Sequence, residues 1–351
     1  MPARRLVDRI QAEIAAQGGW LSFARYMELA LHEPGLGYYS RGDRQFGAGG
    51  DFITAPELGS LFGRTLARQV KELGENQILE LGAGSGALAE TLLNELACEY
   101  LILETGSALR GRQASRLGNR VKFLESLPER FRGVVIANEV VDAMPVHALA
   151  WRSEGIMERG VCKQLIWQER PASGRLLEEA KTIQVPIPYE SEIGLAGRAW
   201  MRTLADRLEQ GVILVVDYGF PRHEYYHPQR SMGTLMCHTR HRAHGDPFLQ
   251  PGEQDITAHV EFSALARAAR EAGLEVLGYA AQAQFLVNCG ITDVLGQANV
   301  ENALHYAPIA AQAQKLLSPA EMGELFKVLA VGRGVKQPLS GFARGDRSNT
   351  L

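Results

Sequence analysis

Residues 77–87 read Gln-Ile-Leu-Glu-Leu-Gly-Ala-Gly-Ser-Gly-Ala, and the architecture of the chain can be worked out from them. The first five residues are mostly apolar and predict a short buried strand, and the three glycines predict a turn. Apolar residues continue at helical spacing from Ala87 to Leu96, so a helix begins where the glycines end. Strand, turn and helix together form half of a nucleotide-binding βαβ unit. Glycine suits this turn because it reaches positive φ and lets a ligand approach the backbone closely.

Two classes of ligand fit the turn. The pattern Gly-x-Gly-x-x-Ala, at Gly82, Gly84 and Ala87, is typical of a dinucleotide site. The pattern acid-x-Gly-x-Gly-x-Gly, from Glu80 to Gly86, is typical of the S-adenosyl-L-methionine (SAM) site of class I methyltransferases. Glu80 favours SAM, because an acid could hold the cationic methionine end and would be a poor neighbour for phosphates. A plain loop and a nicotinamide-dependent oxidoreductase stay open as alternatives.

Length and composition indicate a globular protein with a sizeable core. The 351 residues are 46% hydrophobic and 22% charged. The net charge of −3 gives no basic field for nucleic acid. The four cysteines lie far apart, which indicates a reducing compartment rather than a disulfide framework. No apolar run could span a bilayer, and there is no signal-peptide core. We therefore expect a cytoplasmic protein without membrane insertion, or a mitochondrial matrix protein in a eukaryote.

The first 58 residues are expected to form N-terminal helices and a glycine-rich lid. Apolar spacing predicts helices at 3–16 and 23–31, which we expect to pack over the glycine-rich core. Residues 43–57 are rich in glycine and show no periodicity, and such long loops are often functional. A lid over the cofactor would bring Asp51, Thr54 and Pro56 to the site, and a plain connecting loop is the alternative.

The core is predicted at 59–333 as a doubly wound α/β fold with a seven-stranded, mostly parallel sheet. Its strands are expected at 78–81, 100–103, 121–124, 134–137, 212–216, 274–280 and 326–331. The second strand ends in Glu104, 22 residues beyond Gly82. This is close to the spacing of about 20 at which an acid takes the ribose hydroxyls of an adenosine cofactor.

Polar residues follow the strand at 134–137, at the sheet edge where ligands bind in such folds. Asn138, Glu139 and Asp142 leave this strand where a transferred methyl group should point, and we predict them as the catalytic residues. The alternative is that the two acids only begin a helix and face its dipole.

Three further residues are assigned to substrate binding. Asp217 and Tyr218 follow the apolar strand at 212–216 and reach the same edge of the sheet. His259 ends a polar loop that we expect to bind substrate or lock the site. This loop also holds His238, His241, His244 and Asp246, but their spacing matches no zinc motif and arginines interleave with them, so we predict no metal.

Two insertions interrupt the alternating pattern, at 146–193 and 220–260. The first is predicted to form a β-hairpin from strands at 146–151 and 161–167, as a cap on the substrate side. Residues 334–351 have little to bury and are expected to form a flexible tail.

Six segments of the chain are similar to those of the MidA family, which includes the mitochondrial complex I assembly factor 7. They are His-Glu-Pro-Gly-Leu-Gly-Tyr-Tyr at 32–39, Gly-Asp-Phe-Ile-Thr-Ala-Pro-Glu at 50–57, Leu-Glu-Leu-Gly-Ala-Gly-Ser-Gly at 79–86, Asn-Glu-Val-Val-Asp-Ala-Met-Pro at 138–145, Val-Asp-Tyr-Gly at 216–219 and Gly-Glu-Gln-Asp-Ile-Thr-Ala-His at 252–259. The resemblance covers nearly the whole chain and is far more specific than the glycines.

The resemblance implies a class I, Rossmann-like methyltransferase with SAM as cofactor. The mitochondrial member is a protein arginine methyltransferase acting on a complex I subunit, so an arginine-bearing protein is the partner that it implies. A homodimer is compatible with it. One departure is that the family usually has a serine two residues after Glu104, where this chain has Gly106.

Under this interpretation Glu139 and Asp142 would hold a guanidinium group by charge-assisted hydrogen bonds, and Asn138 would position it. A non-catalytic assembly module that retains SAM binding would carry the same acids and remains the alternative.

Overall fold

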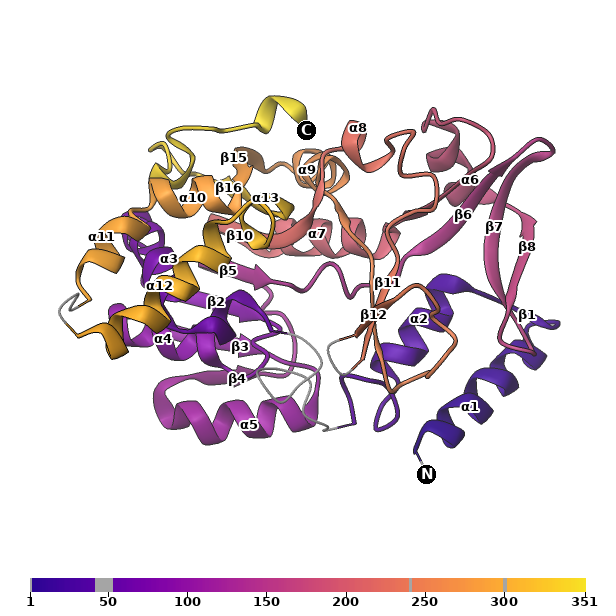
Figure 1. Ribbon diagram of the computed structural model, residues 1–351, viewed down its shortest axis with the longest axis horizontal. Coiled ribbons are helices and arrows are strands. Elements are labelled where there is room, and N and C mark those ends of the chain that lie inside the picture. The colour runs from indigo at the N-terminus through magenta and orange to yellow at the C-terminus, as the bar shows by residue number, and fades with distance from the viewer. Residues whose placement is uncertain (1, 42–52, 240–241, 299–301) are drawn as a thin grey trace.

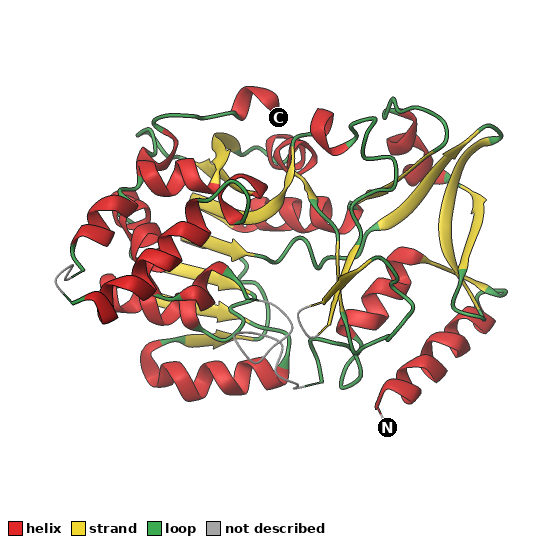
Figure 2. Cartoon of the chain, in the orientation of Figure 1, coloured by secondary structure: helices red, strands yellow, loops and turns green. Residues whose placement is uncertain are grey.

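The computed structural model describes residues 2–41, 53–239, 242–298 and 302–351. They form two lobes that lie side by side (Figure 1). One lobe is a sheet with helices on both faces, and the other combines the N-terminal helices with the inserted strands (Figure 2).

The sheet of the first lobe is built outward from the strand before the glycine turn. β2 (Gln77–Leu81) pairs in parallel with β3 (Glu99–Leu103) and β5 (Phe131–Asn138). The other strands are β4 (Lys122–Leu124), β10 (Leu208–Phe220), β14 (Val260–Glu261), β15 (Glu275–Ala281) and β16 (Phe326–Arg333). The order is β15-β16-β10-β5-β2-β3-β4, and among these strands β16 alone is reversed. The predicted sheet is confirmed, with the two-residue β14 added beside β10.

Helices cover both faces of this sheet because the central strands are apolar on both faces. One face of β10 carries Val212, Leu214 and Val216 and packs against a first group of helices. The other face carries Ile213 and Val215 and packs against a second group. The first group is α3 (Ser60–Leu73), α4 (Ala87–Glu95), α10 (Gln282–Asn288), α11 (Ile291–Gly296) and α12 (Ala303–Leu317), and the second is α7 (Leu195–Arg207) and α9 (Phe262–Glu271). The short η1 (Ala55–Leu58), α5 (Ser107–Leu117), α8 (Arg222–Tyr225) and α13 (Met322–Leu325) complete the helices near the site.

The first insertion forms an antiparallel sheet rather than a single hairpin. Its strands are β6 (His147–Arg152), β7 (Gly155–Cys162), β8 (Trp167–Pro171) and β9 (Tyr189–Ile193), joined by β1 (Trp20–Ser22) from the N-terminus. The predicted strand at 161–167 is wrong, because most of it is the turn between β7 and β8. Leu165 closes that turn with a left-handed φ of 54° and an N–H donated to the Cys162 carbonyl at 2.9 Å.

The N-terminal helices pack on this inserted sheet. The sequence had predicted that they pack over the glycine-rich core, and that prediction is wrong. α1 (Pro2–Ala16) and α2 (Phe23–His32) share one apolar cluster with Ala148 and Val161. α6 (Gly174–Lys181) covers the opposite face through Trp151. The physical reason is β1, which lies between the helices and pairs with β7.

The second insertion forms a small sheet of β11 (Met236–Thr239), β12 (Arg242–His244) and β13 (Asp255–Thr257). Cys237 and Ile256 place it in the same apolar cluster as α1 and α2. We call α1, α2, α6 and the two inserted sheets the insertion lobe, and the rest the core lobe.

The C-terminal residues, predicted as a flexible tail, lie against the core lobe instead. Leu339 and Phe342 are buried. Asp346 accepts the Tyr279 N–H at 3.0 Å, and Asn288 donates to the Gly341 carbonyl at 2.9 Å. Two apolar side chains and these hydrogen bonds are enough to order a segment without periodicity. Across the described ranges, no helix combines the length and apolarity needed to cross a membrane.

Candidate active site

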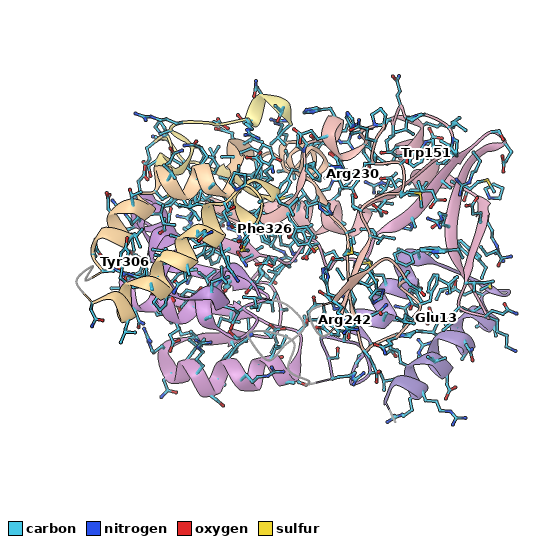
Figure 3. The ribbon with its side chains drawn as sticks, in the orientation of Figure 1. Glu13, Trp151, Arg230, Arg242, Tyr306 and Phe326 are labelled. Carbon is cyan, nitrogen blue, oxygen red and sulfur yellow. The ribbon has the colours of Figure 1, made fainter. Side chains whose placement is uncertain are left out.

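A cavity of about 670 Å³ lies at the carboxyl ends of β2, β3, β5 and β10, between the two lobes. This is the edge at which doubly wound sheets bind ligands. The insertion lobe contributes His32 and Asp255 to its wall, and the segment after α2 contributes Tyr39. Phe326, at the start of β16, also lines the cavity and lies near the middle of Figure 3.

The glycine turn forms one wall. Gly82, Gly84 and Gly86 have φ values of 64°, 55° and 82°, in the left-handed region that favours glycine. The Gly82 N–H donates to the Leu103 carbonyl at 3.1 Å, which ties the turn to the end of β3. Gly82 and Gly84 line the cavity, whereas Gly86 is the N-cap residue of α4.

Glu80 lies below the turn, where it is buried and lines the cavity. The Tyr100 hydroxyl donates to its Oε2 at 2.8 Å. Burial raises the pKa of Glu80 to about 7, against the effect of this hydrogen bond. A nearby cation stabilises the ionised form of a buried carboxyl group whose pKa is raised. Glu80 could therefore pair with the ammonium group of a methionine.

Glu104 is held by a donor at each oxygen. The Gly106 N–H donates to Oε1 at 2.9 Å and Gln113 Nε2 donates to Oε2 at 3.0 Å. The same Gln113 amide donates to the Gly84 carbonyl at 2.9 Å, so it joins the glycine turn to the acid. Sequence reasoning missed Gln113. The signal that could have found it is its place on the buried face of α5, four residues after Leu109 and four before Leu117.

Gly106, where the family usually has a serine, lies close to the segment that follows α2. A Cβ atom at this position would lie 2.9 Å from the Tyr39 carbonyl oxygen. Glycine therefore allows this close approach. Residue 106 donates its backbone N–H to Glu104, where a serine could donate a hydroxyl.

The predicted catalytic residues lie at the end of β5, where Asn138 is the last residue, and on the tight turn that follows. Glu139 has a left-handed φ of 53°, and its N–H donates to the Val216 carbonyl at 2.8 Å. Asp217 Oδ2 accepts the N–H groups of Val141 and Asp142 at 2.9 and 3.3 Å. Asp217 is fully buried and lies behind the cavity wall, so it holds the turn rather than the substrate. A non-glycine residue at positive φ is often found at functional sites.

Glu139, Asp142 and Asp255 bring three carboxyl groups to this end of the cavity. Burial, and next the charge of Asp142, raise the pKa of Glu139 to about 8. Burial raises the pKa of Asp142 to about 6, opposed by a hydrogen bond from Tyr218. At neutral pH, Glu139 is therefore largely uncharged until a cation enters and favours its ionised form.

Two acceptors at this end are open to a ligand. Asn138 Oδ1 and Asp142 Oδ1 are buried and, in the described part of the chain, have no hydrogen-bond partner. Asn138 Nδ2 and the Ala55 N–H both donate to Glu139 Oε1, at 3.2 and 3.3 Å. Buried polar atoms without a partner need an explanation, and a ligand that donates hydrogen bonds supplies one.

Aromatic and histidine side chains form the opposite wall. The His32 ring stacks on Tyr39 at 5.6 Å, and the Tyr39 hydroxyl donates to Asp255 Oδ1 at 2.9 Å. The sequence did not assign these three residues to the site, although the family segments at 32–39 and 252–259 contain them. Tyr218 and His259, which the sequence assigned to substrate binding, line the cavity with their rings edge to face at 5.1 Å.

The described part of the predicted lid reaches the cavity. Thr54 and Pro56 line it, and the Ser85 hydroxyl donates to Glu57, which ties η1 to the glycine turn. The predicted cofactor residue Asp51 lies outside the described residues. Among those described, no group of three or more histidine, cysteine and acidic side chains could hold a metal ion.

The residues present fit SAM. The left-handed glycine turn lines the cavity, Glu80 is a buried acid that a cation would stabilise in its ionised form, and Glu104 presents oxygens that accept from a diol. With the strand order and the single reversed strand, they define a class I SAM-dependent methyltransferase. The chain belongs to the family described as "Putative S-adenosyl-L-methionine-dependent methyltransferase", whose model matches residues 61–280. Its cofactor is SAM, and the predicted family is confirmed.

Solved structures and curated proteins agree with this assignment. A COG1565 superfamily member from Burkholderia thailandensis, bound to S-adenosyl-homocysteine, is 48% identical, with a TM-score of 0.96 over 100% of this chain and 97% of that one. The mitochondrial protein arginine methyltransferase NDUFAF7 homolog of Drosophila melanogaster is 29% identical, over 96% of this chain and 88% of its own. The Danio rerio protein arginine methyltransferase NDUFAF7 is 28% identical, over 93% and 87%.

Proposed function

We propose that this protein transfers the methyl group of SAM to an arginine side chain of a protein partner. The observation that carries the proposal is the group of carboxyls, Glu139, Asp142 and Asp255, beside the unpartnered oxygen of Asn138. The names of the NDUFAF7 relatives as protein arginine methyltransferases support the same substrate. Cytoplasmic location and a homodimer belong to this proposal as well.

A guanidinium group matches this end of the cavity in charge and in hydrogen bonding. It carries five N–H donors and keeps its charge at all working pH values. Its arrival would favour the ionised forms of Glu139 and Asp142, whose pKa values are raised in its absence. Carboxylates can then bind it through paired, charge-assisted hydrogen bonds, which fix its plane.

The chain's own residues would then act by positioning. SAM, when bound, supplies an already activated methyl group. Glu80 and Glu104 orient the two ends of the cofactor, while Glu139 and Asp142 align the nucleophilic nitrogen for in-line attack. The side chains of both lobes surround the cavity and would exclude water once SAM and the arginine side chain are bound. Alignment and exclusion of water are the main contributions that such a reaction needs.

Glu139→Gln tests the proposal, because glutamine keeps the size of the side chain and removes its negative charge. We expect SAM affinity, measured by calorimetry, to be unchanged. Transfer of tritiated methyl groups to the proteome of a strain lacking this protein should fall by about 100-fold or more. Mass spectrometry of the labelled band should place the methyl group on arginine in the wild-type reaction.

The matched control is Glu154→Gln, at the exposed turn between β6 and β7, which should label the band at the wild-type rate. Full labelling by Glu139→Gln would refute the role of Glu139. If wild-type protein binds SAM but labels no protein, the non-catalytic assembly module becomes the better description.

A further inference from the structure

A second, much smaller cavity lies behind the wall of the reaction cavity. Its volume is about 30 Å³, and α7, α9 and the turn after β5 contribute to its lining. Its polar lining side chains are Arg198, Tyr225, His259 and Glu261, and the others are apolar or glycine. His259 and Met144 line both cavities, so these two residues lie between them.

Three buried atoms of these side chains, Arg198 Nε, His259 Nδ1 and Glu261 Oε2, have no hydrogen-bond partner among the residues that the structure describes. Arg198 and Glu261 form an ion pair, but its Nη2–Oε2 distance of 3.6 Å is too long for a hydrogen bond. Buried polar atoms in folded proteins nearly always have a partner in the protein or in ordered water. The volume of about 30 Å³ is enough for one water molecule, which needs two to four polar partners.

Because all three residues line this small cavity, a single water molecule in it is the natural shared partner of the three atoms. Arg198 Nε can only donate, so it donates to the water oxygen. With the ring proton of His259 on Nδ1, the imidazole donates to the same oxygen, and the water donates to Glu261 Oε2. The imidazole is fixed in place by stacking on Phe220 at 5.3 Å and by the edge-to-face contact with Tyr218. Such a water molecule would connect His259 to Glu261.

We propose that His259 accepts the proton that the nucleophilic nitrogen loses during methyl transfer and passes it through this water molecule to Glu261. This path rests on the proposed function. As the carbon–sulfur bond breaks, its electron pair stays on sulfur, and the nitrogen lone pair forms the new bond to carbon. The nitrogen's proton moves to His259 Nε2, the Nδ1 proton moves to the water, and a water proton moves to Glu261.

Electrostatics favour a path with a second acceptor over a histidine that keeps the proton. Burial, and next the charge of Arg230, lower the pKa of His259 to about 4, so the ring does not hold a proton at neutral pH. Burial raises the pKa of Glu261 to about 7. Glu261 can therefore take the proton, provided that it begins the cycle ionised.

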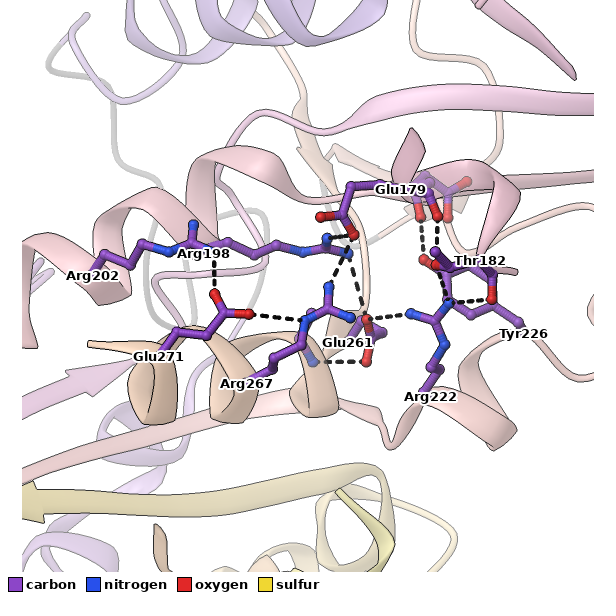
Figure 4. A network of polar contacts seen from close by, with 11 residues as sticks. Glu179, Thr182, Arg198, Arg202, Arg222, Tyr226, Glu261, Arg267 and Glu271 are labelled. Carbon is purple, nitrogen blue, oxygen red and sulfur yellow. Dashed lines mark hydrogen bonds and ion pairs between the residues drawn. The ribbon is translucent and has the colours of Figure 1, made fainter. Parts of the chain in front are cut away.

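Charged groups from three helices face Glu261 and favour its ionised form. They are Arg198 on α7, Arg222 on α8 and Arg267 on α9, and Figure 4 shows them around the carboxylate. Their charges oppose the effect of burial. Arg222 and Arg267 are 29% and 42% exposed, so the network reaches solvent, and the Glu261 side chain, 7% exposed, can release its proton to water there between turnovers.

Three variants interrupt the path at different places. His259→Gln removes the ring. Glu261→Gln removes the final acceptor, while its amide oxygen can still accept the Ala264 N–H that caps α9, at 2.8 Å in the wild type. Gly197→Ala places a Cβ atom 3.1 Å from Val141 and 3.6 Å from Leu265, which both line the small cavity. The added methyl group would take the place of the water without replacing His259 or Glu261.

Single-turnover transfer to the protein that the wild type labels is the measurement. We expect rates about 100-fold lower for His259→Gln and Glu261→Gln, the scale of one general base, and a loss of at least about 10-fold for Gly197→Ala. With SAM and the protein partner bound, which keep Glu80 and Glu139 ionised, the wild-type rate should rise as pH increases through about 7, since Glu261 must be ionised, and Glu261→Gln should lack this rise. SAM affinity and the melting temperature should change little. The control is Gly111→Ala, on the open surface of α5, which should keep the wild-type rate.

The outcomes separate this path from the proposed function. If the wild type methylates no arginine, the proposed function fails and the path fails with it. If the wild type methylates arginine and Glu261→Gln and Gly197→Ala keep its rate and its pH dependence, the path is overturned and the proposed function stands. A high-resolution crystal structure with no water between these three side chains would also overturn the path.

Discussion

Gln113 shares one amide group between two parts of the cofactor site, the Gly84 carbonyl and the Glu104 carboxylate. With the Gly106 N–H on its other oxygen, the Glu104 carboxylate is fixed by two donors before a ligand arrives. Its orientation therefore costs little conformational entropy on binding. Gln113 is fully buried, and it acts through Glu104 and the turn rather than by contact with the cofactor.

Replacing Gln113 by leucine should weaken SAM binding. The change keeps the size of the side chain but removes a hydrogen bond to a charged group, worth about 1.5–3 kcal/mol. We expect the dissociation constant from calorimetry to rise by about 10-fold or more. Gln282→Leu is the control, because Gln282 is also fully buried and donates to the Leu316 carbonyl at 3.2 Å, in another part of the core lobe. An equal loss of affinity in both variants would show a general effect on stability and contradict the role of Gln113.

The strands of the core sheet could be located from the sequence, because each is an apolar run and its partners follow from the usual topology of such folds. The inserted sheets could not, because β1 and β7 pair across more than a hundred residues and no local pattern records that register. The spacing of apolar residues in α1 shows that one face is buried, but not against what. The inserted sheet supplies that partner.

The same difference, between local patterns and tertiary packing, separates the site residues that could be predicted from those that could not. Glu104 and the residues after β5 could be predicted, because the carboxyl ends of parallel strands meet at one edge. His32 and Asp255 come from the insertion lobe and Tyr39 from the segment after α2, and they reach the cavity only through tertiary packing. Asp217 was placed at the correct edge, but the direction of its side chain depends on the turn that it holds.

The glycine turn makes a prediction that separates backbone strain from loss of ligand space. Gly84 and Gly74 are both left-handed, at φ 55° and 68°, and valine at either position should cost about 1–2 kcal/mol of stability. Gly84 lines the cavity, whereas Gly74 ends α3 with no atom near its missing Cβ. We expect Gly84→Val alone to lower SAM affinity, by more than about 100-fold, because the side chain occupies ligand space. Calorimetry and thermal melts measure both effects, and retained affinity in Gly84→Val would remove the turn from the site.

The two lobes enclose the cavity together, so their relative position decides its shape. Beyond the covalent connections, a charged network joins them (Figure 4). Glu179, on α6 of the insertion lobe, accepts from Arg198 at 2.6 Å and from Arg267 at 2.9 Å, both on core-lobe helices. Arg198 is 2% exposed and also pairs with Glu261. Loss of a buried arginine that pairs with two acids should therefore weaken the contact between the lobes, because it leaves their carboxylates without compensation.

Arg198→Met tests that link, with Arg202→Met on the same helix as its control. Removing one partner of a buried ion pair costs about 3–5 kcal/mol, because the remaining charge stays buried without compensation. Arg202 pairs with Glu271 at 2.8 Å but both side chains are partly exposed, at 31% and 50%, and such a pair is worth about 0–1 kcal/mol. Denaturant unfolding should show a loss of this size for Arg198→Met and almost none for Arg202→Met. SAM affinity should also fall in Arg198→Met at temperatures where it stays folded, because the insertion lobe contributes to the cavity wall. Equal stability of the two variants would show that the lobes are held together by their apolar contacts and that the charges of this network add little.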